Sequence, residues 1–225
     1  MNFEHFAAAV RFYETLRYDS VYFRFVDLVD REWPIPSRQL ARHIVRFLNK
    51  FGMRLRESDK LLDGIQSAIL QALPYLQLLR GWKIEDCDLD ATIRVGGDEI
   101  PVRKAAQDVF RIFYKVGQGF ALVAPAKTMH LLAPNFFVMW DDSTSGKLTR
   151  RRWPYWESYA NVFLPKVQVD LEGLVKETMG RFALSSRRDA IENLQSLPKR
   201  TKTMAKLADE YYYSRFTRDL FRAKA

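Results

Sequence analysis

The sequence has little of several features that define common protein classes. It contains one cysteine, Cys87, which excludes an internal disulfide framework and fits a reducing compartment. Its three histidines are far apart in the chain, so we expect no transition-metal site. No apolar run approaches the ~18 residues needed to span a membrane, and residues 1–20 carry charges throughout, so we expect no transmembrane helix and no signal peptide. These absences predict a cytoplasmic or nucleoid-associated protein.

Charge is the most unusual property of what is present. The 225 residues are 48% hydrophobic and 28% charged, which is typical of a globular chain, but the net charge is +9. From Lys147 to the end there are 17 Lys and Arg against 9 Asp and Glu. Such an asymmetry, interleaved with aromatic residues, favours a polyanionic partner and predicts binding to nucleic acid. The alternative is a basic face that is merely solvated.

Apolar residues recur at helical spacing along most of the chain. Helices are predicted over 3–29, from Ser37 to Gly52, from Ser58 to a kink or stop at Pro74, from Ile100 to Phe113, and over 125–133, 153–164, 169–182, 186–196 and 200–221. Ser37, Asp170 and Ser186 are expected N-caps. Residues 83–99 are expected to form a loop with a turn at Gly96-Gly97-Asp98; a small hairpin within 84–95 is the alternative.

The periodicity predicts an all-α protein of about eight to ten helices that forms a single globular unit over 1–225. Two halves are the alternative, with a cleft between them. Residues 30–165 would hold the hairpin and the catalytic core region, whereas 1–29 with 166–225 would supply packing helices and the basic C-terminal region.

Residues 116–142 carry the strongest functional pattern. A turn containing Gly117 and Gly119 precedes an apolar helix with one lysine, Lys127, and an apolar run then ends at Asp141 and Asp142. Glycine-turn amides at a helix N-terminus bind phosphate without reading sequence. A carboxylate stabilises the cationic sugar that forms when a glycosidic bond breaks. The order therefore suits an enzyme that acts on a flipped-out base. Val123-Ala124-Pro125 is a second candidate turn, and the sequence does not choose between them.

This segment resembles the helix-hairpin-helix DNA glycosylase superfamily, which includes endonuclease III-like, adenine-specific and 8-oxoguanine-specific enzymes. Its pattern is a hairpin L-P-G-V-G-x-K-x-A, an apolar helix and an apolar run ending in a catalytic aspartate. Lys127-Thr128 resembles the K-x pair and Asp141 the aspartate. Residues 127–141, with Phe47-Leu48-Asn49-Lys50, are similar to a divergent bacterial and archaeal branch. The resemblance covers roughly residues 36–165, and its hairpin match is the weakest part.

The resemblance implies roles for these side chains. Asp141 is the expected catalytic carboxylate. Asp142 takes that role if the alignment to the family pattern is off by one residue. The alternative is that either residue is only the N-cap of a following helix. Lys127 is the candidate Schiff-base nucleophile, which would add strand cleavage to base removal; a phosphate contact and a solvated lysine at a helix start are its alternatives. His130, three residues further on, is a candidate DNA contact, and a core histidine is the alternative that the sequence favours.

Cations and aromatic residues follow the aspartates. Lys147, Arg150, Arg151 and Arg152 are predicted to bind phosphates. Trp140, Trp153, Tyr155 and Trp156 are predicted to form the base pocket, because aromatic rings stack on bases. The alternative is a basic loop that leads into an aromatic core helix.

Together these features predict a DNA glycosylase that excises a damaged or modified base, either an oxidised purine in repair or a hypermodified cytosine in defence against phage. We expect double-stranded DNA as partner, a monomer and no cofactor. One cysteine cannot hold an iron–sulfur cluster, whereas a hairpin-bound monovalent or divalent cation is compatible with the resemblance. A non-catalytic DNA-binding protein is the main alternative, and a scaffold whose basic tail binds an acidic protein is another.

Overall fold

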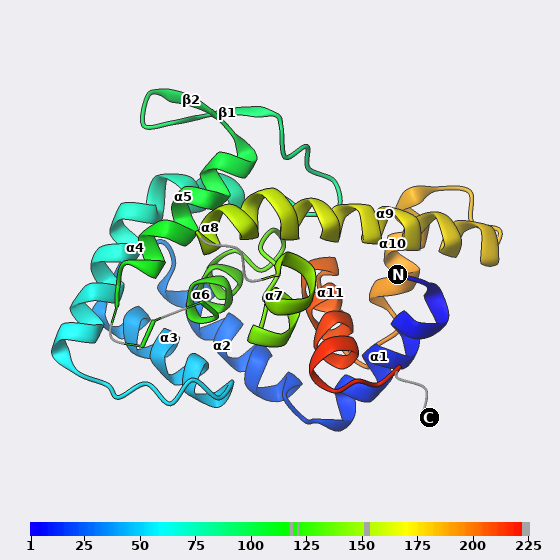
Figure 1. The fold of residues 1–225 in the computed structure, drawn as a ribbon, viewed down its shortest axis with the longest axis horizontal. Helices are drawn as coiled ribbons and strands as arrows, with labels where there is room; N and C mark the ends of the chain where they lie inside the picture. The colour runs from blue at the N-terminus through cyan, green and yellow to red at the C-terminus, as the bar shows by residue number, and fades with distance from the viewer. Residues whose placement is uncertain (118, 121, 151–153, 222–225) are drawn as a thin grey trace.

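The structure is a computed structural model that describes residues 1–117, 119–120, 122–150 and 154–221. These residues are mostly helical (Figure 1). The helices are α1 (Phe3–Thr15), α2 (Asp19–Glu32), α3 (Arg38–Lys50), α4 (Asp59–Leu79), α5 (Val102–Tyr114), α6 (Ala124–Leu132), α7 (Asp142–Thr149), α8 (Tyr155–Ser158), α9 (Leu164–Arg181), α10 (Arg187–Gln195) and α11 (Met204–Tyr212). Two π-helical segments, η1 (Tyr159–Phe163) and η2 (Tyr213–Thr217), continue α8 and α11.

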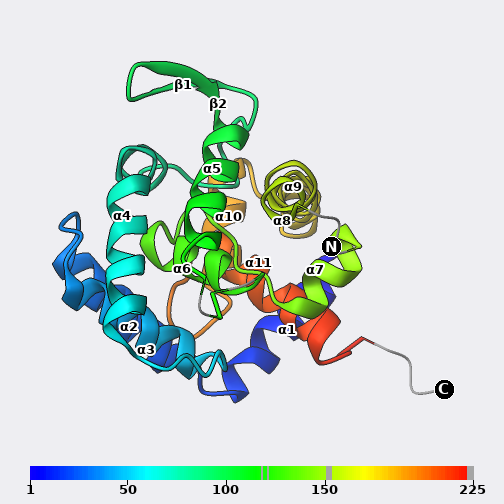
Figure 2. The same cartoon turned by 60° about the vertical axis from the view of Figure 1, so that its left-hand side comes forward.

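Helix α6 lies at the centre of the arrangement, with α2, α3 and α5 packed against it (Figures 1 and 2). Its apolar sequence explains this place, because all of its residues except Lys127 are buried. The long helix α9 runs along one side, and the view of Figure 2 looks nearly along its axis. The apolar core extends from α1 to α11 as one cluster of buried side chains.

Several predicted helix starts are confirmed. The Ser37 hydroxyl accepts a hydrogen bond from the Leu40 amide at 2.9 Å and caps α3. Ser58 caps α4 and Ser186 caps α10 in the same way. Such caps satisfy amides that the first helical turn leaves unpaired. Asp170 was expected to be a cap and is not one. It lies inside α9, where Lys166 and the Tyr212 hydroxyl, at 2.7 Å, contact its carboxylate.

Three other predictions require correction. The single helix expected over 3–29 is two, α1 and α2, because Arg17 adopts a left-handed backbone conformation (φ 58°) between them. The chain from 83 to 101 contains a hairpin in which β1 (Thr92–Val95) pairs antiparallel with β2 (Asp98–Pro101) around the expected glycine turn. The helix that begins at Ser58 passes through Pro74 to Leu79.

A further correction concerns the C-terminal half of the chain. The helices expected separately over 153–164 and 169–182 join, because η1 connects α8 to α9 without an intervening loop. Within the described part of the chain, no helix is long and apolar enough to cross a bilayer.

Candidate functional site

The two residues that the sequence singled out most strongly, Lys127 and Asp141, line the same cavity. Its volume is about 330 Å³. The lining comes from distant parts of the chain: α1 and the link to α2, the end of α3, α6, the run before α7, and α11 with η2. The lining residues are Tyr13, Tyr18, Asn49, Lys50, Phe51, Gly52, Lys127, Met139, Trp140, Asp141, Asp209 and Tyr213.

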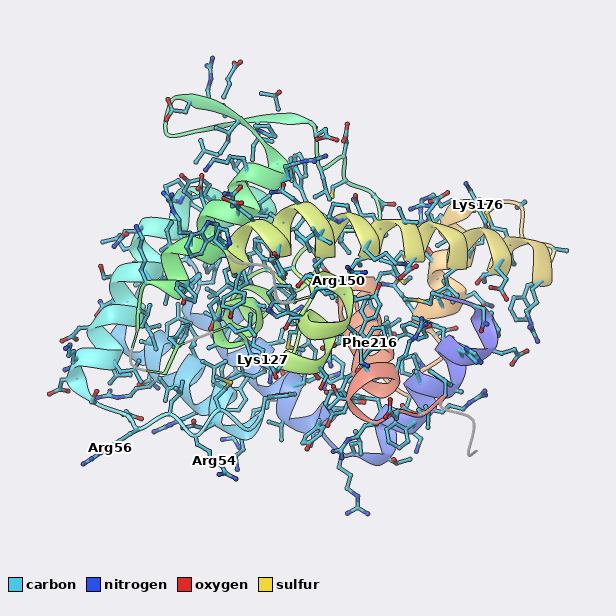
Figure 3. All side chains as sticks on the ribbon, in the orientation of Figure 1. Arg54, Arg56, Lys127, Arg150, Lys176 and Phe216 are labelled. Atoms are coloured by element: carbon cyan, nitrogen blue, oxygen red, sulfur yellow. The ribbon has the colours of Figure 1, made fainter. Side chains whose placement is uncertain are left out.

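Lys127 projects from the central helix α6 and is mostly enclosed by protein (Figure 3). Its ammonium donates a hydrogen bond to the Phe51 carbonyl oxygen at 3.1 Å and lies 5.7 Å from the Phe51 ring centroid. Burial lowers the pKa of Lys127 below its ordinary value, and the charge of Lys206 acts in the same direction. Asp209 and, to a smaller extent, Asp141 oppose the shift. The cavity therefore holds an amine that loses its proton more readily than a surface lysine.

Asp141 is the N-cap of α7, as one of the sequence alternatives proposed. Its Oδ1 accepts a hydrogen bond from the Thr144 amide at 2.6 Å, and its Oδ2 accepts one from the Thr217 hydroxyl of η2. These two bonds fix the carboxylate at the cavity wall. Asp142 is the first residue of α7 and is exposed, and it is not among the residues that line the cavity.

A second carboxylate in the cavity, that of Asp209, was missed by the sequence analysis. Its Oδ2 pairs with the Lys206 ammonium at 2.7 Å. Lys206 is fully buried, and burial lowers its pKa, but Asp209, Tyr13 and Glu210 together raise the pKa well above the ordinary value. Lys206 therefore stays charged and holds Asp209 in place. Asp209 follows Asp141 by almost seventy positions, and only the charged and aromatic character of the chain after Lys147 pointed to this region.

The ion network below the cavity continues from Lys206. The ammonium of Lys206 lies 3.4 Å from a Glu210 oxygen, and Lys202 bridges Glu210 and Asp19 at 2.8 Å and 2.7 Å. The side chains of Lys202, Lys206 and Glu210 have 0% exposure. A buried charge is tolerated only when it is paired and hydrogen-bonded. The network therefore forms a rigid polar layer behind the cavity, joining α11 to the start of α2.

Aromatic side chains form much of the cavity wall, as the base-pocket prediction required, but most are different residues. Tyr13, Tyr18, Phe51 and Tyr213 line it. Trp140 borders the cavity from the core side: its side chain is 1% exposed, and its indole N–H donates to the Leu122 carbonyl at 2.9 Å.

The other predicted pocket residues do not join this wall. Tyr155 and Trp156 pack against Tyr114 of α5, with ring centroids 6.3 Å and 5.5 Å apart, and are not among the lining residues of the cavity. This outcome corresponds to the alternative of an aromatic helix packed on the core. Trp153 lies outside the described residues.

Gly117 and Gly119 form an exposed turn between α5 and α6. Both have positive φ, 68° and 86°, and the Phe120 amide donates to the Gly117 carbonyl at 2.8 Å. Glycine is favoured because side chains disfavour this backbone conformation. Val123-Ala124-Pro125 begins α6, so both candidate turns belong to the same helix-to-helix connection.

His130 does not contact DNA in this fold, because it has no exposed surface. Its Nδ1 lies 2.5 Å from the Phe137 carbonyl oxygen, and its Nε2 lies 2.9 Å from the Tyr22 hydroxyl. Burial lowers the pKa of His130 to about 3. The prediction of a DNA contact is therefore wrong for this residue, and the alternative of a core histidine is confirmed.

The predicted phosphate-binding cations lie apart from the cavity. Lys147 of α7 and Arg150, the C-cap of that helix, are exposed, and neither is among the lining residues. Arg150 follows the helix at its far end from Asp141, about 13.5 Å away along the axis at 1.5 Å per residue. Arg151 and Arg152 are outside the part of the chain that the structure describes.

Many cations of the basic C-terminal third are engaged within the protein. Arg187 pairs with Glu172, Arg188 with Glu192 and Arg181 with Glu4, in addition to the buried Lys202 and Lys206. Within the described ranges, Arg24, Arg46, Lys50, Arg54 and Arg56 have no ion pair, and Lys50 lines the cavity. In Figure 3, Arg54 and Arg56 point away from the body of the protein. Lys50 therefore places unpaired positive charge at the cavity, and Arg54 and Arg56 extend it along the loop that follows α3.

Among residues 1–117, 119–120, 122–150 and 154–221, no group of His, Cys, Asp or Glu could hold a metal ion. Cys87 lies elsewhere, beside the Ile84 carbonyl, and burial raises the pKa of its thiol to about 12. A thiol with such a pKa is a poor nucleophile at neutral pH.

Comparisons with models of protein families, with curated proteins and with solved structures found no match for this chain.

Proposed function

We propose that the protein is a DNA glycosylase of the helix-hairpin-helix type. The observation that carries the proposal is the meeting of the Lys127 amine and the Asp141 carboxylate in one aromatic-walled cavity of about 330 Å³. A pocket of this size lies within the range of small-ligand sites, roughly 300–1,000 Å³. Aromatic walls and a few convergent polar groups suit an extruded base.

The position of the cavity supports the same proposal. Tyr13, Tyr18, Asp209 and Tyr213 belong to one of the two predicted halves of the chain, and Asn49, Lys127 and Asp141 belong to the other. A cleft between two helical halves is what the resemblance implies. The connection of α5 to α6 through an exposed glycine turn is also the order that a helix-hairpin-helix requires.

The chemistry divides among three side chains. Lys127, with its lowered pKa, attacks the sugar C1′ as the bond from C1′ to the base nitrogen breaks, and the base departs with the electron pair and takes up a proton. The fixed carboxylate of Asp141 stabilises positive charge on the sugar. Asp209 accepts the proton that Lys127 loses on forming the new C–N bond. The sugar ring then opens as the C1′–O4′ bond breaks and O4′ takes up a proton, which gives a Schiff base between Lys127 and C1′ that permits strand cleavage.

Oligonucleotide cleavage tests the proposal. Duplexes that carry oxidised purines form one arm, and duplexes that carry hypermodified cytosines form the other, so the assay separates a repair role from a defence role. We expect the wild type to release the base from at least one arm and Asp141→Asn to abolish release. Strand breaks that appear without alkali, and a covalent complex trapped by borohydride, should both be lost in Lys127→Gln. A matched control is Lys176→Gln, since Lys176 lies on the exposed surface of α9.

One observation favours a second candidate, a DNA-binding protein without catalytic activity. Both oxygens of Asp141 already accept hydrogen bonds, so its role is complete without a substrate. This candidate predicts salt-sensitive binding of duplex DNA by the wild type, with no base released from either arm, and unchanged binding by Asp141→Asn.

A further inference from the structure

A second cavity, of about 470 Å³, lies between α2 and α3. It shares two lining residues, Asn49 and Lys50, with the cavity of Lys127 and Asp141, so the two are neighbours. None of the residues predicted from the sequence to act on DNA lines it. Its chemistry divides into an apolar floor, one buried polar group and a cationic rim.

The floor is one face of α2. Val21, Phe25 and Leu28 are spaced by four and three residues, which places them on the same side of the helix. Phe25 is 7% exposed, and Val21 and Leu28 are partly buried against the core. An apolar face of this kind favours a flat hydrophobic body and disfavours a small hydrated ion.

The buried polar group is His43 of α3, which is 6% exposed and lines the cavity. The Gln39 amide nitrogen lies 3.2 Å from its Nε2. Because an amide NH₂ only donates, Nε2 accepts this bond and the ring proton resides on Nδ1. Burial lowers the pKa of His43, which keeps the ring neutral. Nδ1 is buried and has no hydrogen-bond partner in the part of the chain that the structure describes.

An unpaired buried donor costs about 1–3 kcal/mol. A ligand that places an oxygen or nitrogen acceptor beside Nδ1 recovers that cost. The neighbouring Asn49 cannot supply the acceptor, because its amide already makes two hydrogen bonds to the Leu55 backbone, at 2.9 Å and 2.5 Å. The cavity therefore favours a flat apolar ligand that carries a hydrogen-bond acceptor.

The rim consists of Arg24, Arg46 and Lys50, which are exposed. None of them has an ion pair within the described residues. Three uncompensated cations around one opening form a local positive potential, and guanidinium groups bind phosphate with two parallel hydrogen bonds. The ligand therefore carries an anionic group at the mouth of the cavity.

We propose that the cavity between α2 and α3 is a second binding site for a nucleotide, with the base on the Val21–Phe25–Leu28 floor, an acceptor of the base at His43 Nδ1, and the phosphate at Arg24, Arg46 and Lys50. An anion with an alkyl chain would also fit the floor and the rim, but its chain has no acceptor for the Nδ1–H group of His43. The same chemistry is present in a free mononucleotide and in one unit of a DNA strand that passes the neighbouring cavity. The site does not depend on base excision.

The experiment measures binding by calorimetry to the full chain. Its probes are the four deoxynucleoside monophosphates, inorganic phosphate and a five-residue single-stranded oligonucleotide. We expect saturable binding of a monophosphate or of the oligonucleotide, and much weaker binding of phosphate alone. Tight binding of a monophosphate identifies a free nucleotide as the natural ligand. Binding of the oligonucleotide at least 10-fold tighter than that of any monophosphate identifies a strand, by the roughly 1.4 kcal/mol that a tenfold difference represents.

Variants locate the ligand. His43→Leu and Arg46→Ser should each weaken binding by about 5- to 30-fold, the equivalent of roughly 1–2 kcal/mol. Arg111→Ser should leave it unchanged, since Arg111 is an exposed residue of α5 that does not line the cavity. Thermal denaturation checks that each variant is folded, and His43→Gln, which keeps a donor, should restore part of the affinity.

Three outcomes overturn the proposal. The first is no saturable binding of any probe at millimolar concentration. The second is a loss of binding in Lys127→Gln with none in His43→Leu, which places the ligand in the first cavity. The third is equal binding of phosphate and nucleotides, which leaves the apolar floor without a role. Because nucleotide binding and base release are measured separately, the failure of the second site is distinguished from the failure of the proposed glycosylase activity.

Discussion

The titration of Lys127 is the property of a single residue that most directly reports the chemistry of the cavity. Burial favours the neutral amine, whereas Asp209 and Asp141 favour the ammonium. Since the native pKa is lowered, the unfolded chain binds a proton that the folded chain lacks in the pH window between the native value and the ordinary value of about 10.4. The contribution of this group to stability therefore increases as pH rises through that window.

Removing a neighbouring carboxylate should shift this titration further. Asp209→Asn deletes the stronger of the two opposing charges, so we expect the pKa of Lys127 to fall, and Asp141→Asn should lower it by less. The measurement is an NMR titration of the lysine side chains, with Lys127 assigned from the signal that disappears in Lys127→Gln. A rise in either variant, or a larger effect of Asp141→Asn, would show that Asp209 does not face the amine.

At the scale of secondary-structure elements, α7 begins at the same residue that the proposed chemistry uses. Asp141→Ala removes the cap and should lower the free energy of unfolding by about 1 kcal/mol, whereas Asp141→Asn keeps a capping side chain and should cost much less. If the carboxylate has only a structural role, Asp141→Asn retains base release and Asp141→Ala loses part of it. If it is catalytic, both lose base release. Denaturant unfolding, measured beside the glycosylase assay, separates these cases.

The elements that were predicted well are those with local signals. Ser37, Ser58 and Ser186 begin helices because their hydroxyls reach an amide three residues later, an interaction that the sequence reveals. The break at Arg17 has no glycine or proline to mark it, so no local signal in the sequence predicts it. The hairpin had its glycine turn predicted, but its strands are too short for periodicity to identify.

The same distinction applies to the candidate site. The sequence placed Lys127 and Asp141 together because a short helix and an apolar run connect them. Asp209, Tyr13 and Tyr213 reach the cavity only through the packing of α11 and η2 against α1, which no local pattern encodes. His130 shows the opposite error: a spacing of three from Lys127 suggested a shared function, but burial of that face of α6 makes it part of the core.

At the scale of the whole molecule, the distribution of charge changes the expected DNA-binding face. The sequence located the excess charge after Lys147, and several of the cations there, among them Arg181, Arg187 and Lys202, form ion pairs within the protein. In the described part of the chain, cations without an ion pair also line the two cavities: Lys50 lines the first, and Arg24, Arg46 and Lys50 line the second. Lys50, Arg54 and Arg56 are the exposed set nearest to the cavity of Lys127 along the chain, and Figure 3 shows Lys176 at the opposite end of the molecule from Arg54 and Arg56.

Salt dependence of DNA binding tests which face is used. Each phosphate contact that is lost lowers the slope of log K against log salt by about 0.9 for duplex DNA. Lys50→Gln, Arg54→Asn and Arg56→Gln combined should lower it by about 2 to 3; Asn is chosen at position 54 because it tolerates the left-handed backbone there (φ 53°). Lys176→Gln should leave the slope unchanged. Counterion release depends only on the phosphates that the protein contacts. If a Lys147 and Arg150 double variant lowers the slope and the triple variant does not, the binding face is α7 and not the end of α3.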